Sequence, residues 1–143
     1  MPQADPLSVL QDHIAYHFAD GELLDRALTH RSWAHDQSPP GEDNERLEFL
    51  GDAVLSLVVS EHLVEAYPDD EGHLTRARAA LVRREKLAEL ARGLDLGRWL
   101  KLGRGEETTG GREKDSILAD SFEALLGAIY RDGGLLPARA FVL

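Results

Sequence analysis

Asn44-Glu45-Arg46-Leu47-Glu48-Phe49-Leu50-Gly51-Asp52 is the stretch that decides the fold. It predicts the start of a long helix, on which Glu45, Glu48 and Asp52 share one face at about 100° per residue. The apolar run that follows, from Ala53 to Val59, predicts that the helix is buried in the core. Acids at the head of a buried helix repel one another, so they need a cation, and a divalent metal is the simplest one.

Helical spacing of apolar residues recurs on both sides of this stretch. It predicts helices over about 7–18, 23–28, 44–66, 74–91 and 115–132, and a last helix that begins at Leu135. Either Asp43 or Asn44 is suited to cap the central helix. Loops are expected over 35–43 and 103–111, where Pro and Gly gather. Strand-like alternation is absent, so we expect an all-α fold of six or seven helices.

Length and composition indicate one globular domain. The chain has 143 residues, of which 43% are hydrophobic and 29% charged. It has no cysteine, which excludes thiolate chemistry and cysteine-bound zinc. Its first six residues lack the pattern of a signal peptide, and its apolar runs are too short to span a bilayer. We therefore expect a cytoplasmic protein with no membrane partner.

A second pair of acids repeats the pattern of the first. Asp120 and Glu123 lie three residues apart within the otherwise apolar stretch from Ile117 to Leu126. If the two helices pack side by side, these acids can converge with Glu48 and Asp52. Such an all-oxygen site favours Mg²⁺, with Mn²⁺ as a substitute. The chemistry that it predicts is metal-assisted hydrolysis of a phosphate ester.

The stretch from Asn44 to Asp52 resembles the hallmark motif of the ribonuclease III catalytic domain, of the bacterial type. The resemblance extends over nearly the whole chain, and the other matching segments are 27–32, 70–72, 74–90, 102–106, 116–120 and 123–130. It implies the all-α endonuclease-domain fold of that family. It also implies a homodimer that cuts both strands of double-stranded RNA, in rRNA and mRNA processing, and leaves 5′-phosphate and 3′-hydroxyl ends.

Roles for individual residues follow from the same resemblance. Four acids would be the Mg²⁺ ligands and catalytic residues: Glu48, Asp52, Asp120 and Glu123. Loss of Glu123 would abolish cleavage and spare RNA binding. Glu45 and Glu71 would be accessory acids of unsettled role. Phe49 would insert into a pocket of the partner subunit, whereas its pattern alone favours ordinary core packing. We expect a structural hydrogen-bonding role for His30.

The family's usual bacterial form carries a C-terminal double-stranded-RNA-binding domain, whereas this sequence ends at Leu143. We therefore expect residues 1–143 to be the catalytic domain of a truncated chain. The net charge of −10 is unusual for a protein that binds nucleic acid through its overall field. The best local basic strip lies on the helix after Glu71 and comprises Arg76, Arg78, Arg83, Arg84 and Lys86.

Two other functions stay open. An all-α, Mg²⁺-dependent nucleotide pyrophosphohydrolase also uses paired glutamates, which would here be Glu45, Glu48, Glu61 and Glu65. That reading leaves Asp120 and Glu123 without a role. A dimer that binds double-stranded RNA without cutting it is the other alternative, although all four proposed ligands are present. The glycine-rich stretch 103–111 lacks the Gly-Lys-Ser/Thr ending of a phosphate-binding loop.

Overall fold

The computed structural model describes residues 6–143, and in this part of the chain the fold is all-α, as predicted. The long helices are α4 (Glu45–Ala66) and α8 (Asp115–Gly133). The others are α1 (Pro6–Ile14), α2 (Gly21–Ala27), α3 (Arg31–Asp36), α5 (Glu71–Leu81), α6 (Arg84–Gly93), α7 (Arg104–Thr108) and α9 (Leu135–Val142), with 3-10 turns at Leu96–Trp99 and Gly111–Glu113. The expected lack of a signal peptide concerns a segment that lies mostly outside the described residues.

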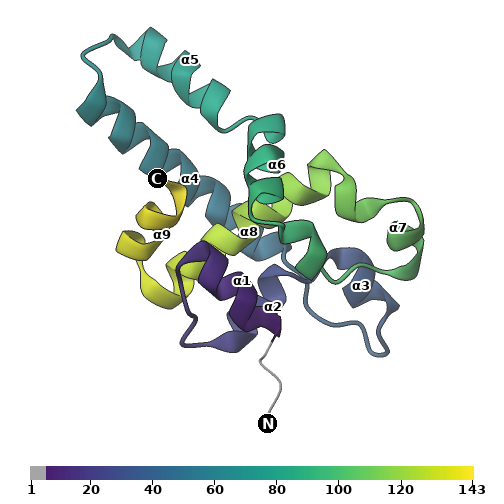
Figure 1. The fold of residues 1–143 in the computed structure, drawn as a ribbon. Helices are drawn as coiled ribbons and strands as arrows, with labels where there is room; N and C mark the ends of the chain where they lie inside the picture. Colours follow the sequence, from purple (N-terminus) through teal and green to yellow (C-terminus); the bar gives the residue numbers. More distant parts are fainter. Residues whose placement is uncertain (1–5) are drawn as a thin grey trace.

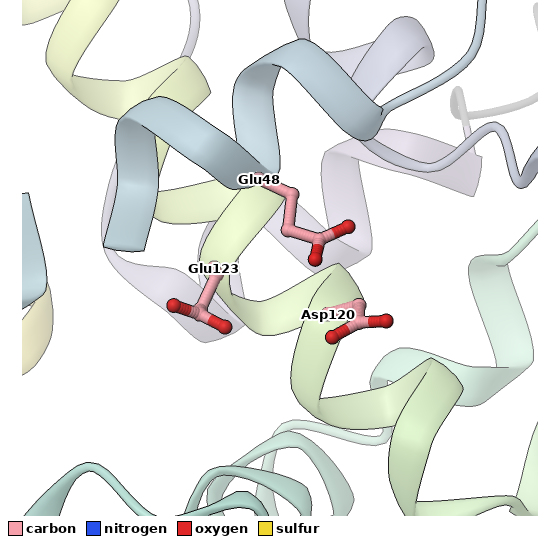
Figure 2. A group of neighbouring side chains, drawn as sticks. All are labelled: Glu48, Asp120 and Glu123. Atoms are coloured by element: carbon pink, nitrogen blue, oxygen red, sulfur yellow. The ribbon is translucent and has the colours of Figure 1, made fainter. Parts of the chain in front are cut away.

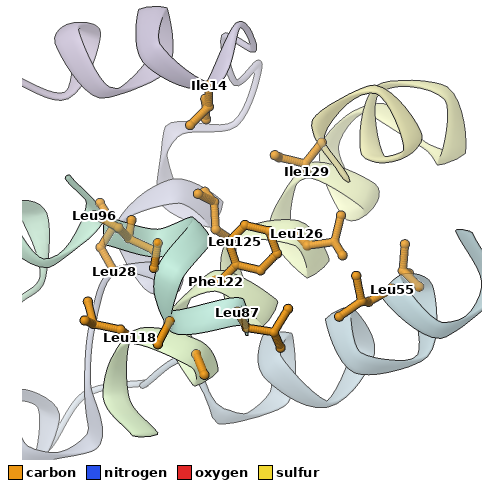
Figure 3. Close-up of a cluster of buried hydrophobic side chains, with 14 of the residues drawn as sticks. Ile14, Leu28, Leu55, Leu87, Leu96, Leu118, Phe122, Leu125, Leu126 and Ile129 are labelled. Carbon is orange, nitrogen blue, oxygen red and sulfur yellow. The ribbon is translucent and has the colours of Figure 1, made fainter. Parts of the chain in front are cut away.

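Helix α8 is the centre of the molecule. It contacts α4, α6, α2 and α9, and in Figure 1 it lies in the middle of the fold. Its buried face carries Phe122, Leu125 and Leu126, which meet Leu55 of α4 and Leu87 of α6 in the core drawn in Figure 3. Burial of one such side chain contributes roughly 1.5–3 kcal/mol, so this contact stabilises the fold and holds α4 against α8.

Helix α4 is buried along one flank only. Leu47, Val54 and Val58 face the core, whereas Phe49, Leu57 and Val64 on other faces are exposed. The predicted burial of this helix is therefore correct for one side. The C-terminal half of α4 and the antiparallel α5 project together from the body as an arm, in which α5 has no buried residue. Helix α9 covers part of the α4 side of the arm, whereas the outer apolar side chains Leu57 and Val64 stay open to solvent.

One predicted helix is two in the structure. The expected helix over 74–91 turns at Val82 and Arg83, where Arg83 has extended backbone, and so becomes α5 and α6. Helix α5 packs along α4, whereas α6 packs on α8, and the chain must change direction between them. Ala77 of α5 and Ala88 of α6 are eleven residues apart, which is about three helical turns. The apolar residues on both sides of the break therefore fit the spacing of one continuous helix, and the sequence pattern does not reveal the break.

Short helices also occupy segments that were expected to be loops. Helix α3 extends to Asp36, and α7 lies within the glycine-rich stretch 103–111. Conversely, α1 ends at Ile14, four residues before the predicted end, because Ala15 adopts a left-handed conformation with φ 56°. Together these differences raise the number of α-helices in residues 6–143 to nine, above the expected six or seven. None of the described helices is long and apolar enough to cross a bilayer.

Candidate active site

Two glycines set the distance between α4 and α8. A Cβ atom on Gly51 would lie 1.7 Å from the carbonyl oxygen of Glu123, and one on Gly127 would lie 2.2 Å from the carbonyl oxygen of Leu47. Any larger residue at either position would push the backbones apart. The crossing therefore brings the first two turns of α4 against the middle of α8, which is where the two pairs of acids lie.

Three of the four predicted ligands meet at this crossing. Glu48 of α4 and Asp120 and Glu123 of α8 each offer a carboxylate oxygen, and the three oxygens lie within 4.8 Å of one another. Figure 2 shows the three carboxylates extending from the two helices into the same space. Asp52 lies outside this trio, but it is adjacent to Glu123 and interacts with it by a side-chain hydrogen bond. Three of the four acids thus converge from the two helices, and Asp52 lies at the exposed edge beside Glu123.

The clustered acids hold their protons more tightly than free carboxylic acids do. Burial, followed by the hydrogen bond and field of Asp52, raises the pKa of Glu123 to about 9. Burial, followed by the field and hydrogen bond of Asp120, raises the pKa of Glu48 to about 7. Both shifts mean that the ionised cluster has too little positive charge around it. A bound cation would supply that charge.

The cluster lies in an open cleft with a volume of about 1070 Å³. Glu45 lines this cleft and lies 3.8 Å from Arg31, and both side chains are more than half exposed. Arg31 is the only Lys or Arg side chain among the described residues that line the cleft. Phe49 lies at the cleft with 83% of its surface exposed, which is incompatible with the core packing that its pattern alone favours.

The remaining predicted residues lie elsewhere. Glu71 is exposed in the first turn of α5 and does not line the cleft. The four arginines of the strip also lie outside it, on α5 and at the start of α6. Arg78 donates a hydrogen bond to Ser60 at 3.0 Å, so this arginine is partly engaged within the arm. Arg83 and Arg84 are exposed at the turn between the two helices.

Sequence reasoning placed neither His30 nor Glu106 in the cleft, although it expected a structural hydrogen-bonding role for His30. Both lie in segments that carry the family resemblance, but neither has a periodic or paired pattern that would predict a place in the site. Lys114 holds the carboxylate of Glu106 at 2.9 Å, and this pairing lowers the pKa of Glu106. Burial lowers the pKa of His30 in spite of the opposing field of Glu106.

The donor set fits a hard divalent cation. All four side chains offer carboxylate oxygens only, and no sulfur or imidazole ligand belongs to the group. Mg²⁺ and Mn²⁺ prefer such oxygen ligands and keep several positions for water or phosphate. The raised pKa values indicate that a cation would replace protons on Glu48 and Glu123 when it binds.

The comparisons with known proteins agree with this fold. A family model described as ribonuclease-III-like matches residues 20–143. The chain is 56% identical over 135 residues to ribonuclease 3 of Oleidesulfovibrio alaskensis, a match that covers 94% of this chain and 59% of the relative. It is 54% identical over 143 residues to ribonuclease 3 of Desulforamulus reducens, with 99% of this chain and 58% of the relative covered. The chain thus spans less than two thirds of the length of these relatives.

A solved structure is similar as well. It is the nuclease domain of ribonuclease III from Campylobacter jejuni, studied for structural flexibility in a region involved in dimer formation. The match has a TM-score of 0.89 and 43% sequence identity, and it covers 94% of this chain and 92% of that domain. A second structure of the same domain matches with a TM-score of 0.88.

Proposed function

The chain belongs to the ribonuclease-III-like family, and from this premise we propose that residues 1–143 form the catalytic domain of an Mg²⁺-dependent endoribonuclease. The domain hydrolyses phosphodiester bonds in double-stranded RNA, leaves 5′-phosphate and 3′-hydroxyl ends, and acts in rRNA and mRNA processing. The observation that supports this most directly is the carboxylate cluster that Glu48, Asp120 and Glu123 form across the helix crossing. The C-terminal RNA-binding domain expected from the resemblance would belong to the additional length of the relatives.

In this proposal Glu48, Asp52, Asp120 and Glu123 hold the metal and are the catalytic acids. When bound, Mg²⁺ supplies a water of lowered pKa and a positive charge that balances the charge developing on the phosphate. Glu123 and Glu48 must lose their protons to take part, because their pKa values are raised to about 9 and about 7. Proton and metal therefore compete for the same oxygens. Mn²⁺, with its similar ligand preference, can substitute.

We also propose that the domain acts as a homodimer in which Phe49 inserts into the partner subunit. A phenylalanine with 83% of its surface exposed leaves a large apolar area in water, and a partner surface would remove that area. Phe49 lies next to the acids at the cleft, so a partner that covered it would also border the site. Two copies would supply two clusters, one for each RNA strand.

Contacts with the RNA backbone would come from the basic strip on α5 and the start of α6. Arg83 and Arg84 are exposed, and with Arg76, Arg78 and Lys86 they form the basic strip of α5 and α6. A net charge of −10 makes such a local strip necessary, because the overall field repels a polyanion. Glu45 and Glu71 are accessory acids in this proposal. Glu45 would act at the cleft edge, whereas Glu71 on the arm would reach the RNA only outside the cleft.

The pyrophosphohydrolase alternative loses its support. Glu48 and Glu61 are thirteen residues apart on α4, which is about 20 Å along a helix and too far for one metal site. Glu61 and Glu65 instead pair with Arg139 of α9. A non-catalytic dimer would bind double-stranded RNA as the enzyme does, but it would not cut it. The experiment must therefore measure cleavage.

The test is to incubate the purified chain with long double-stranded RNA in Mg²⁺, in Ca²⁺ and in EDTA. We expect staggered cuts in Mg²⁺ alone, with products that a 5′-phosphate-dependent exonuclease degrades. The Glu123→Gln variant should not cut, and a matched Glu85→Gln variant, altered at an exposed acid of α6, should cut normally. RNA that is bound but uncut in Mg²⁺ would favour the non-catalytic dimer. Hydrolysis of free nucleotides would favour the pyrophosphohydrolase.

A further inference from the structure

His30 is held at the edge of the cleft by hydrogen bonds that all reach one side of its ring. It is the N-cap of α3, where its Nδ1 accepts the backbone N–H of Ser32 at 3.1 Å. The Ser32 hydroxyl lies 2.7 Å from the same nitrogen. That hydroxyl also accepts the backbone N–H of Gly103 at 2.8 Å. The Ser32 hydroxyl therefore connects the imidazole ring to the segment that begins α7.

This arrangement determines the tautomer of His30. The Ser32 oxygen accepts a hydrogen bond from the Gly103 N–H, so its own O–H can point at Nδ1, which also accepts the Ser32 backbone N–H. A neutral imidazole with an accepting Nδ1 carries its proton on Nε2. The assignment follows from the hydrogen-bond geometry, as it must where hydrogen atoms are placed by inference.

The Nε2–H side of the ring has no hydrogen-bond partner among residues 6–143. His30 lines the same cleft as Asp120 and Glu123. Its pKa is lowered by burial, which keeps the ring neutral near pH 7 and preserves a single N–H donor. Gly103 is required for this placement, because a Cβ atom there would lie 2.5 Å from the carbonyl oxygen of Ser32.

Cationic side chains, which would attract phosphate, are scarce in the rest of the cleft. The ionisable side chains of its lining are mostly acids: Asp43, Glu45, Glu48, Asp52, Glu106, Asp120 and Glu123. Ionised carboxylates accept hydrogen bonds and cannot donate them, so they repel the phosphates of RNA. Arg31 is the one Lys or Arg in the described lining, and its side chain is 74% exposed beside Glu45. The partly buried N–H of His30 is better fixed in position.

We propose that the Nε2–H of His30 donates a hydrogen bond to a phosphate oxygen of double-stranded RNA bound in the cleft, and that Ser32 and Gly103 position the ring for this contact. The inference rests on the proposed function and adds a substrate-binding residue to it. A hydrogen bond from a neutral donor to a charged acceptor is strong enough to matter, because its loss typically weakens an interaction about ten- to hundredfold.

Two substitutions at one position separate this contact from the cap. His30→Asn keeps an oxygen near the place of Nδ1, so it still caps α3, but it is too short to reach the position of Nε2. His30→Gln places an amide N–H near the position of Nε2 and weakens the cap. His13→Asn, altered at an exposed histidine of α1, is the matched control.

The experiment measures thermal unfolding and the cleavage of double-stranded RNA in Mg²⁺ for the wild type and the three variants. We expect His30→Asn to melt like the wild type and to lose about tenfold or more in kcat/KM. His30→Gln should melt lower and recover part of the lost rate, and His13→Asn should match the wild type in both. The ¹⁵N shifts of the wild-type ring should show the proton on Nε2.

The outcomes distinguish this inference from the proposed function. Wild-type kcat/KM in His30→Asn would overturn the contact and leave the nuclease assignment intact. Equal loss in both variants, in step with lower melting temperatures, would mean that His30 serves only as a cap. A proton on Nδ1 would also overturn the inference. A wild-type protein that leaves double-stranded RNA uncut would overturn the proposed function, and the inference with it.

Discussion

Gly51 and Glu123 approach each other so closely that a Cβ atom on Gly51 would lie 1.7 Å from the Glu123 carbonyl oxygen. The contact joins α4 to the turn of α8 that carries the acids. Figure 2 shows the consequence, because the carboxylates of Glu48 and Glu123 extend from different helices into one space. Backbone contact between helices is thus the physical basis of the candidate metal site.

Gly51→Ala should therefore separate the helices and disperse the acids. Because the overlap is with backbone that cannot rotate away, we expect a loss of about 3 kcal/mol or more in the free energy of unfolding. Denaturant unfolding measures it. Gly21→Ala is the control, because nothing lies within 4 Å of a Cβ at that helical position, and it should be neutral or stabilising by up to about 1 kcal/mol. Equal stability of the two variants would contradict the close approach.

The stability of the metal-free protein should fall as the pH rises. Glu123 and Glu48 have pKa values of about 9 and about 7 in the folded chain, against an ordinary value of 4.5. Above pH 4.5 the folded state thus binds more protons than the unfolded state. The stability that these two acids contribute is therefore fully present below pH 4.5, and it is lost as the pH rises through each folded pKa. Unfolding in EDTA between pH 5 and 9 measures this trend.

Mg²⁺ should reverse that trend, because it binds the ionised cluster and its affinity rises with pH. The Glu123→Gln variant has no ionisable group at this position, so its free energy of unfolding should depend less on pH. A free energy of unfolding that rises between pH 5 and 9 in EDTA would contradict the raised pKa values.

Glu123→Ala should abolish cleavage and leave binding of double-stranded RNA within about threefold of the wild type, because the RNA contacts proposed for the basic strip are intact. It should also lose the rise in melting temperature that Mg²⁺ gives the wild type. Gel-shift binding in Ca²⁺, cleavage in Mg²⁺ and thermal scans measure the three effects. Full cleavage by the variant would remove Glu123 from the catalytic set.

Phe49→Ala should shift the chain from dimer to monomer and leave each subunit folded, because the side chain is 83% exposed in the single chain. Sedimentation velocity measures the shift, and circular dichroism checks the fold. Leu136→Ala is the matched control, since Leu136 is 81% exposed on α9 and has no place in the proposed interface. An unchanged dimer for Phe49→Ala would exclude its insertion into a partner.

Replacing both Arg83 and Arg84 by Ala should weaken RNA binding to a similar extent for all sequences. Each phosphate contact that is lost should reduce the slope of log affinity against log salt concentration by about 1. Titrations at several salt concentrations with the Glu123→Gln protein measure this. Arg131→Ala, at an exposed arginine of α8, is the control. A salt slope that the double variant leaves unchanged would assign RNA binding to another surface.

Much of the fold could be predicted because the pattern is local. The limits of α4 and α8 follow from apolar spacing and from the residues that end each helix, and both agree with the structure to within about a residue. The break at Val82 could not be predicted, because the spacing stays in phase and only the different partners of α5 and α6 require a turn. Short helices such as α7 carry too few apolar residues to produce a pattern.

The sequence by itself determined the residue types of the candidate site and the face on which each acid lies, since helical periodicity depends only on local geometry. Only the tertiary structure decided which acids meet, because their approach depends on two glycines, Gly51 and Gly127, that let separate helices touch. It likewise decided that Phe49 is exposed and that Nδ1 of His30 is an acceptor. Exposure and hydrogen bonding depend on neighbours that are distant in sequence, and no local pattern contains them.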